Sequence, residues 1–250
     1  MAKPPTETRT LCGRTLIAAA RQRPAVTTPP ISTVCFDLDG TLLTYNQNPD
    51  AVLATAFDDA GVEQFCDPTQ LWAAADDVDD ADDDIDFLTK TFRAAGERHD
   101  GATDSPDVLA QAYDDATDHT DVSFRPGAQT ALERAREHGR VGLITNGGRA
   151  TQRQKLDALD IHDAFEIHVY AGEMTPPKPA TEPFERATTA LDADPERTLY
   201  VGNSLRHDVA GARAAGLQAA WFPVEGDGGD HDGHDPHHVF DSLHDLGDVL

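Results

Sequence analysis

Val34-Cys35-Phe36-Asp37-Leu38-Asp39-Gly40-Thr41-Leu42 is the stretch of sequence that indicates the fold most clearly. The apolar run that leads into it, from Ile31 to Phe36, predicts a short buried strand. Two carboxylates, Asp37 and Asp39, follow the strand, and Gly40 then allows a sharp turn. A pair of Asp residues alone is more often a solvated turn. After an apolar strand, however, the pair lies where open α/β sheets bind their ligands.

The rest of the chain supports a sheet with helices between its strands. After Pro126 strand-like and helical segments alternate, which favours β-α units on a parallel sheet. The predicted strands are 140–145, 165–170, 197–201, 217–222 and 237–240, and the predicted helices are 127–138, 151–159, 182–191, 205–215 and a last one capped by Ser242. We therefore predict an α/β fold, a doubly wound parallel sheet with a Rossmann-like core.

A second, smaller domain is predicted between the first strand and this alternating region. Residues 48–121 have a helical pattern, and 21 acidic side chains stand against Lys90, Arg93 and Arg98, a net charge of 3 − 21 = −18. We assign 31–47 and 122–250 to the α/β core and 48–121 to the helical domain. Residues 1–30 are expected to be a disordered extension, or to follow from a start codon placed too early.

The composition limits the partners of the protein. The formal net charge is −25, and 34 of the 45 acidic residues are Asp, so the surface should repel nucleic acid and anionic lipid. With 39% hydrophobic residues the chain should nevertheless fold, and we interpret it as a protein of a halophile. Three cysteines without close pairing and no membrane-spanning stretch favour the cytoplasm. An ordinary acidic mesophilic protein is the alternative.

Three further motifs follow in the chain. They are Gly142-Leu143-Ile144-Thr145-Asn146-Gly147, the Lys178-Pro179 pair, and the segment from Tyr200 to Asp208, which contains Asn203. Lys178 is one of only four lysines, so its place there is notable. Together with Asp37 and Asp39, these motifs resemble the four ordered motifs of the haloacid dehalogenase-like superfamily, over about residues 31–250. Asn203 departs from the acid that is usual in that family.

The resemblance implies a magnesium-dependent phosphatase. Asp37 would attack the phosphorus and form an aspartyl-phosphate, and Asp39 would protonate the leaving alkoxide and later deprotonate water. Mg²⁺ would bridge Asp37, the phosphate and Asp208, with the Asp39 carbonyl and Asn203 as further ligands. The phosphoryl oxygens would be held by Thr145, Asn146, Gly147 and Lys178.

The inserted helices imply a mobile cap over a small phosphorylated metabolite. Carbon–halogen hydrolysis is a rival within the fold, although Asp39 argues against it because a departing halide needs no acid. A phosphomutase also fits the motifs, as does a catalytically weak regulatory or binding protein, which Asn203 would favour. The sequence leaves the substrate and the oligomeric state open.

Three other features carry less weight. The run from Asp76 to Asp86 is interpreted as a solvated acidic face, because it lacks the glycine and spaced glutamate of a calcium loop. The loop with His231, His234, His237 and His238 could bind a transition metal, but its spacing defines no geometry. Trp72 and Trp221 are assigned to the core.

The net charge generates a prediction about salt. We expect the melting temperature to rise steeply from dilute buffer to molar KCl, because at 1 M salt the Debye length is about 3 Å and the repulsion between carboxylates is screened. Thermal unfolding followed across that range of KCl tests this. A melting temperature that stays constant or falls with salt contradicts the halophilic interpretation.

Overall fold

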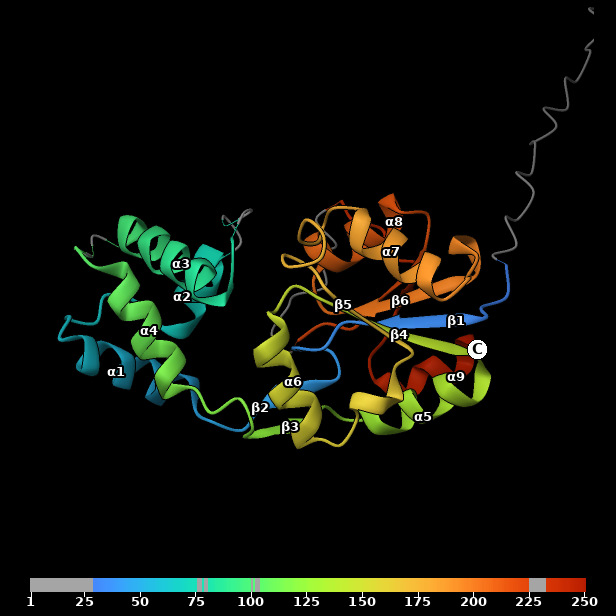
Figure 1. Cartoon of the computed structure of the whole chain (residues 1–250), viewed down its shortest axis with the longest axis horizontal. Helices are drawn as coiled ribbons and strands as arrows, with labels where there is room; N and C mark the ends of the chain where they lie inside the picture. Colours follow the sequence, from blue (N-terminus) through green and yellow to red (C-terminus); the bar gives the residue numbers. More distant parts are fainter. Residues whose placement is uncertain (1–28, 76–77, 79–80, 100, 102–103, 225–232) are drawn as a thin grey trace, which may run out of the picture.

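A parallel sheet of six strands forms the centre of the protein. The computed structural model describes residues 29–75, 78, 81–99, 101, 104–224 and 233–250. The strands lie in the order β5-β4-β1-β6-β7-β8, and every neighbouring pair is parallel. Figure 1 labels the first four of them. Their bounds are β1 Thr33–Phe36, β4 Arg140–Thr145, β5 Ile167–Tyr170, β6 Thr198–Gly202, β7 Gln218–Trp221 and β8 His238–Val239. The predicted α/β fold with a doubly wound parallel sheet is confirmed.

Helices cover both faces of this sheet. Helix α5 (Ala128–His138) and the short helix α9 (Leu246–Val249) lie on one face, where their apolar side chains share a core with β1 and β4. Helices α7 (Glu182–Ala190) and α8 (Ala210–Ala214) lie on the other face, against Ile144 and Tyr200 (Figure 1). The helix α6 (Arg149–Ala158) follows β4. Strands β1, β6 and β7 are buried throughout and β4 is buried after Arg140, which explains their nearly continuous apolar sequences, whereas the edge strands β5 and β8 are partly exposed.

The order of the strands determines where a ligand could bind. β1 lies between β4 and β6, so the chain winds from β1 toward one edge through β4 and β5, and then toward the other edge through β6, β7 and β8. A crevice forms at the carboxyl ends of the strands where the winding reverses. Residues that directly follow β1, β4 and β6 therefore converge at one place.

Four helices form a separate lobe with its own apolar core. We call α1 (Pro49–Ala60), α2 (Pro68–Ala75), α3 (Asp84–Arg98) and α4 (Pro106–Ala116) the helical lobe. Its buried cluster includes Leu53, Phe57, Phe92 and Leu109, and no residue of the sheet belongs to it. Helix α1 begins where the Asn48 side chain accepts a hydrogen bond from Ala51 N and ends at Gly61, whose φ is 66°.

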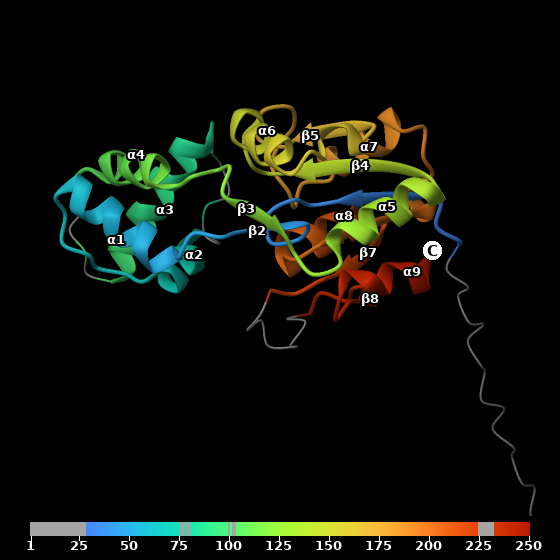
Figure 2. The ribbon, with the colours of Figure 1, turned by 90° about the horizontal axis from the view of Figure 1, so that it is seen from below.

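A two-stranded antiparallel ribbon connects the two lobes. Strand β2 (Leu43–Tyr45) leads into the helical lobe, β3 (Val122–Phe124) leads out, and Leu43 pairs with Phe124 (Figure 2). Neither strand was predicted, because three residues are too few to show an alternating pattern. The two places where the chain passes between the α/β core and the helical lobe therefore lie side by side.

Other differences from the sequence prediction are local. The helix predicted over 205–215 begins as one π-helical turn, Leu205–Val209, and continues as α8. Trp221 is buried as predicted, but Trp72 is 43% exposed, and its assignment to the core was wrong. Trp72 lies on an outer side of α2 and contacts Tyr113 edge-on at 6.2 Å. Several predicted features lie outside the described residues: residues 1–28 of the extension predicted over 1–30, His231, and Asp76, Asp77, Asp79 and Asp80 of the acidic run.

Among the described residues, no helix is both long and apolar enough to cross a membrane. Within the same ranges, no group of three or more His, Cys, Asp or Glu side chains is arranged to hold a metal ion. The histidines of the C-terminal loop that are described therefore form no such group. His237 instead hydrogen bonds through Nδ1 with Ala219 N, at 3.0 Å.

The separate core of the helical lobe can be tested by mutation. Phe92 is fully buried and contacts Phe57 and Tyr113 edge-on, with distances between ring centres of 6.0 and 5.8 Å. We expect Phe92→Ala to lower the free energy of unfolding by about 3–5 kcal/mol, because it leaves a cavity. The control Trp72→Ala should cost about 1 kcal/mol, since that ring is half-exposed. Denaturant unfolding at fixed KCl measures both, and equal losses would contradict this packing.

Candidate active site

Asp37 is fixed directly after the central strand. Its backbone N–H donates to Val201 O at 3.0 Å, which continues the pairing of β1 with β6, and the residue is only 6% exposed. Gly40 then turns the chain with φ 70°, a conformation that favours glycine. A Cβ atom at this position would lie 2.9 Å from Asn203 Nδ2, so the turn packs closely against the loop after β6.

The ammonium group of Lys178 connects the two most deeply buried carboxylates. Lys178 Nζ donates to Asp37 Oδ1 at 2.8 Å and to Asp208 Oδ1 at 2.7 Å. All three side chains are less than a tenth exposed. Burying a charge is costly unless it is paired and hydrogen-bonded, so this lysine can lie here only because the two carboxylates surround it.

These contacts shift the proton affinities of the groups. Burial raises the pKa of the Asp37 carboxyl, since the loss of hydration outweighs the attraction of Lys178, and Asp208 adds repulsion. Burial also acts to lower the pKa of Lys178, but Asp208 and Asp37 outweigh it and the pKa is raised. Lys178 therefore stays cationic, and a further cation near Asp37 and Asp208 would relieve their mutual repulsion.

Two side chains orient Lys178. The Tyr200 hydroxyl lies 2.8 Å from Lys178 Nζ and donates to Ile144 O at 2.9 Å. The Asn146 amide holds the backbone of the same residue, because Asn146 Oδ1 accepts from Lys178 N at 2.8 Å and Nδ2 donates to Lys178 O at 3.1 Å. The sequence assigned Asn146 to phosphate binding, but its side chain is occupied by Lys178. Tyr200 was not identified from the sequence, because a tyrosine in a buried strand is an ordinary core residue.

Asp208 comes from the π-helical turn Leu205–Val209. Ser204 caps this turn by accepting from His207 N at 3.0 Å, and Ser204 N donates to Asp208 Oδ2 at 2.9 Å. Gly202 leaves space for the carboxylate, since a Cβ there would lie 2.4 Å from Asp208 Cγ. π-helical turns occur frequently at functional sites.

Asn203 and Asp37 share a neighbour, the hydroxyl group of Thr41. The Thr41 hydroxyl is 3.2 Å from Asp37 Oδ2 and 3.2 Å from Asn203 Oδ1, and it can donate to either one. Asp37, Asp208 and the Asn203 carbonyl oxygen thus form a set of oxygen donors, the kind that Mg²⁺ prefers. The donor chemistry of these residues fits a hard divalent cation, with two carboxylates rather than three.

Asp39 has different partners from Asp37. Lys155 Nζ lies 2.8 Å from Asp39 Oδ1 and 3.0 Å from Oδ2, and Gln152 Nε2 donates to Oδ2 at 2.7 Å. Burial acts to raise the pKa of Asp39, but Lys155 and Gln152 outweigh it and the pKa is lowered. Neither residue of α6 was identified from the sequence. The scarcity of lysine, which marked Lys178, was the signal that could also have marked Lys155.

Thr145 ends β4 next to this pair. It is 2% exposed, and its hydroxyl oxygen accepts from Gly147 N and from Gln152 Nε2, each at 3.2 Å. The structure therefore brings Thr145 and Gly147 to the same sheet edge as Asp37, Asp39, Lys178 and Asp208. All the residues that the sequence predicted for the site lie in this one region.

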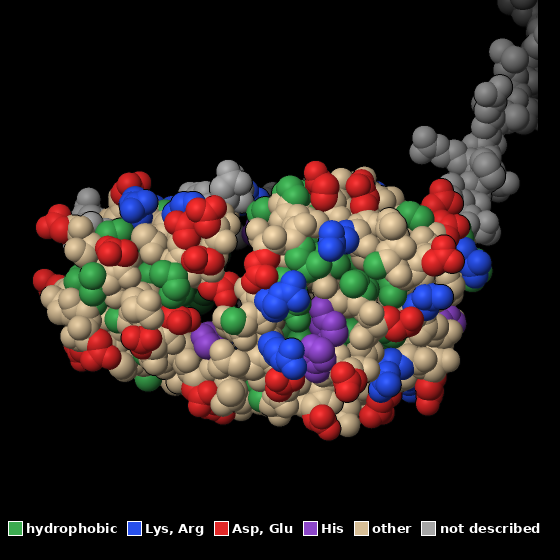
Figure 3. Space-filling model, viewed as in Figure 1, with side chains coloured by type: hydrophobic (Ala, Val, Ile, Leu, Met, Phe, Trp, Pro, Cys, Tyr) green, Lys and Arg blue, Asp and Glu red, His purple; other side chains and the backbone are tan. Residues whose placement is uncertain are grey.

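The helical lobe contacts the core beside the site. Asp84 Oδ1, in the first turn of α3, accepts from Gly148 N at 2.8 Å, directly before α6. Asp84 belongs to the acidic run, so one member of the expected solvated face contacts the α/β lobe. Acidic side chains are scattered over the visible surface of both lobes, and Lys, Arg and His side chains gather on one part of the α/β lobe (Figure 3).

The chain is similar to known hydrolases. A family model described as haloacid dehalogenase-like hydrolase matches residues 31–216. Among curated proteins, a phosphoglycolate phosphatase of Cereibacter sphaeroides is 36% identical over 87% of this chain and 96% of its own length. A phosphoserine phosphatase of Thermus thermophilus is 33% identical over 54% of each chain, and a glyceraldehyde 3-phosphate phosphatase of Pyrococcus abyssi is 37% identical over 39% of this chain. The match thus spans only about half the length of these last two relatives, 54% of the phosphoserine phosphatase and 41% of the glyceraldehyde 3-phosphate phosphatase.

Solved structures share the fold. The HAD hydrolase YfnB from Bacillus subtilis, described as bound to magnesium and as showing interdomain movement, superposes with a TM-score of 0.68 at 21% identity, over 89% of this chain and 99% of its own. A haloacid dehalogenase-like protein from Streptococcus pneumoniae superposes with a TM-score of 0.70 at 18% identity, over 87% of this chain and 97% of its own. At these identities the likeness shows the fold alone.

Proposed function

Because the chain belongs to the haloacid dehalogenase-like hydrolases, we propose that it is a magnesium-dependent phosphatase, which transfers the phosphoryl group of a small monoester to Asp37 and then to water. The observation that carries the proposal is the buried group of Asp37, Lys178 and Asp208, which places a nucleophile beside a fixed cation. The phosphatase names of the curated relatives support the reaction type.

Asp37 is suited to the attacking role. Its carboxylate stands at the end of β1, and Lys178 and Thr41 each contact one of its oxygens. Attack by a carboxylate oxygen on phosphorus forms the aspartyl-phosphate and releases the alkoxide. Lys178 supplies positive charge for the phosphoryl oxygens, and the Thr145 hydroxyl and the backbone N–H of residue 146 would be further donors; the Gly147 N–H, which donates to Thr145 Oγ1, would have to exchange that partner for the phosphate.

Asp39 is suited to proton transfer. It stands two residues after Asp37, and its side chain is 38% exposed, so it can meet both the leaving oxygen and the incoming water. In the second step it would take a proton from water, to which its lowered pKa is suited; in the first step it would give a proton to the alkoxide, and for this it must take up a proton when the substrate binds. The same carboxyl thereby serves both halves of the reaction.

The groups that would hold Mg²⁺ are the carboxylates of Asp37 and Asp208, the Asn203 side chain and the Asp39 carbonyl. When bound, the cation would neutralise charge on the phosphate. The buried carboxylates need such compensation, since Lys178 provides a single positive charge for two of them. The magnesium described for YfnB is consistent with this assignment in a protein of the same fold.

The helical lobe is proposed to be a cap that limits the substrate to a small molecule. It is joined through the β2–β3 ribbon and contacts the site loop through Asp84. A cap of this kind covers residues 48–121, with the core formed by 31–47 and 122–250. We further propose that the protein works in the cytoplasm of a halophile, on the grounds of its −25 charge.

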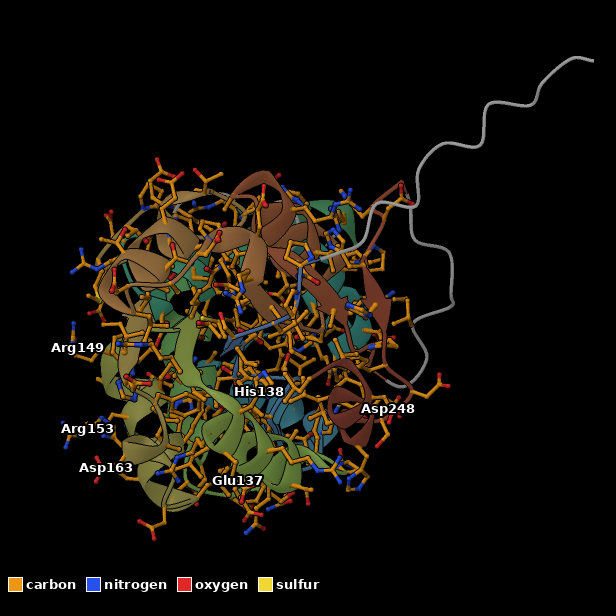
Figure 4. The ribbon with its side chains drawn as sticks, turned by 90° about the vertical axis from the view of Figure 1, so that its right-hand side faces the viewer. Glu137, His138, Arg149, Arg153, Asp163 and Asp248 are labelled. Atoms are coloured by element: carbon orange, nitrogen blue, oxygen red, sulfur yellow. The ribbon has the colours of Figure 1, made fainter. Side chains whose placement is uncertain are left out.

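The first test replaces the nucleophile. We expect Asp37→Asn to reduce hydrolysis to background at molar KCl with magnesium, because the amide keeps the shape but lacks the attacking charge. Folding should survive, since Lys178 still pairs with Asp208. The control is Asp248→Asn on α9, where the side chain lies at the surface (Figure 4). Phosphate release from a panel of phosphorylated metabolites, each incubated with both variants, measures the effect. Substantial activity in Asp37→Asn would contradict the covalent mechanism.

The second test concerns Asn203. We expect Asn203→Asp to lower the magnesium concentration for half-maximal activity by about tenfold, which corresponds to about 1.4 kcal/mol for the added negative charge. Asp208→Ala should nearly abolish activity. The added carboxylate also repels phosphate, so the maximal rate is expected to fall. A magnesium titration at fixed KCl measures both variants, and a shift below about threefold would show that Asn203 orients the loop instead of binding the metal.

A further inference from the structure

Asp84 reaches from the helical lobe to the loop that follows β4. Its Oδ1 accepts from Gly148 N at 2.8 Å, and 64 positions separate the two residues along the chain. Asp84 is half-buried, although its neighbours in the acidic run, Asp82 and Asp83, are exposed. This carboxylate therefore has a defined partner in the α/β core, unlike the members of a solvated acidic face.

The lack of a side chain at position 148 leaves space for this carboxylate. A Cβ atom there would lie 2.8 Å from Asp84 Oδ2 and 3.1 Å from Asp84 Cγ. The backbone of Gly148 has φ −64° and ψ 146°, an extended conformation that any residue can adopt. Glycine is thus favoured here by the close approach of Asp84 and not by the conformation of the backbone.

The same contact provides a hydrogen bond at the start of α6. Gly148 is the N-cap residue of this helix and has no side chain that could cap it. Carboxylates of distant segments bond the amide groups instead: Asp84 accepts from Gly148 N, and Glu173 Oε1 accepts from Arg149 N at 2.7 Å. Negative charge at a helix N-terminus is favourable. The two carboxylates differ in origin, because Asp84 belongs to the helical lobe and Glu173 to the α/β core.

The loop 145–148 between β4 and α6 is anchored at both ends. At one end, Thr145 is the last residue of β4, and its hydroxyl oxygen accepts from Gly147 N at 3.2 Å. At the other end, Gly148 is held by Asp84. The backbone N–H groups of residues 146 and 147, which are proposed to bind phosphate, lie between these anchors. A displacement of Gly148 would therefore move them, and small displacements of groups that bind the reacting centre are costly.

We propose that Asp84 is a positioning residue, which holds the loop 145–148 from the helical lobe, so that this loop is complete only while the lobe lies against the α/β core. This inference rests on the proposed phosphatase function. On this proposal the helical lobe does more than exclude large substrates, because its contact with the core also improves the binding of the phosphoryl group. A carboxylate that only capped α6 would stabilise the helix, whichever lobe it came from.

The experiment compares Asp84→Ala with wild type in two measurements at molar KCl. Hydrogen exchange of the segment 146–150, followed by mass spectrometry without substrate, should become about tenfold faster at the Gly148 amide, because its acceptor is lost. Inorganic phosphate, used with magnesium as a competitive inhibitor, should show an inhibition constant about tenfold higher, and kcat/KM should fall by about as much. Asp84→Asn keeps an oxygen acceptor and should stay within about threefold of wild type in both measurements.

Gly148→Ala tests the same contact from the α/β core. The added Cβ should displace the Asp84 carboxylate, so we expect losses similar to those of Asp84→Ala. In the double variant, Gly148→Ala should add little to Asp84→Ala, because the contact is already absent, whereas independent effects would add. If Asp84→Ala does not fold, Gly148→Ala decides by the same two measurements.

Two control variants separate positioning from capping and from loss of charge. Glu173→Ala removes the carboxylate from the next amide of α6 but leaves the lobes in contact, and Asp50→Ala removes an exposed charge from the first turn of α1. Both should change the inhibition constant of phosphate by less than about threefold. Equal losses in Glu173→Ala and Asp84→Ala would show that Asp84 only caps α6. Unchanged hydrogen exchange or unchanged phosphate inhibition in Asp84→Ala would also overturn the proposal. Hydrogen exchange needs no turnover, so this result is separate from activity in Asp37→Asn, which would overturn the proposed function instead.

Discussion

The site depends on one buried ion pair network, in which Lys178 lies between Asp37 and Asp208. The three side chains come from three different segments, and none could be buried alone, because an unpaired charge in the interior is strongly destabilising. Their partners are fixed as well. Asn146 holds the Lys178 backbone and Ser204 N holds Asp208, so the network connects the ends of β1, β4 and β6. The crevice where the winding of the sheet reverses therefore contains a single network of charged side chains.

The two aspartates pair with different lysines, Asp37 with Lys178 and Asp39 with Lys155. Asp37 is almost fully buried and shares Lys178 with Asp208, and burial raises its pKa. Asp39 is more exposed and has Lys155 to itself, and despite burial its pKa is lowered. Two carboxyl groups two residues apart thus acquire opposite shifts in pKa from their surroundings. The lowered pKa keeps Asp39 ionised, as the step that takes a proton from water requires. The raised pKa of Asp37 opposes the ionised form that attack requires, so a bound divalent cation beside Asp37 would be needed to favour it.

Much of this arrangement could be predicted from the sequence, and the exceptions have physical reasons. The apolar run before Asp37 and the alternation after Pro126 predict buried parallel strands, because such strands carry no polar face. The strands β2 and β3 have three residues each and show no period. Trp72 carries no sign in its neighbours that its side of α2 faces solvent. Lys155 and Tyr200 act through contacts between distant segments, which spacing along the chain does not reveal.

The distribution of cations also bears on how so acidic a protein could attract the anionic substrate that is proposed for it. The chain has only four lysines, and two of them, Lys155 and Lys178, are buried at this site. At a distance, the net charge of −25 repels a phosphate ester, but this long-range field is screened by salt. Buried pairs are screened much less, so the two ammonium groups still act at short range, although they face three carboxylates, Asp37, Asp39 and Asp208. High salt would therefore remove the repulsion that opposes approach and leave the interactions that hold the phosphoryl group. An acidic surface is compatible with phosphate binding on this account, because the surface charge acts at long range and is screened, whereas the two lysines, together with the divalent cation proposed to offset the remaining negative charge, would act at short range.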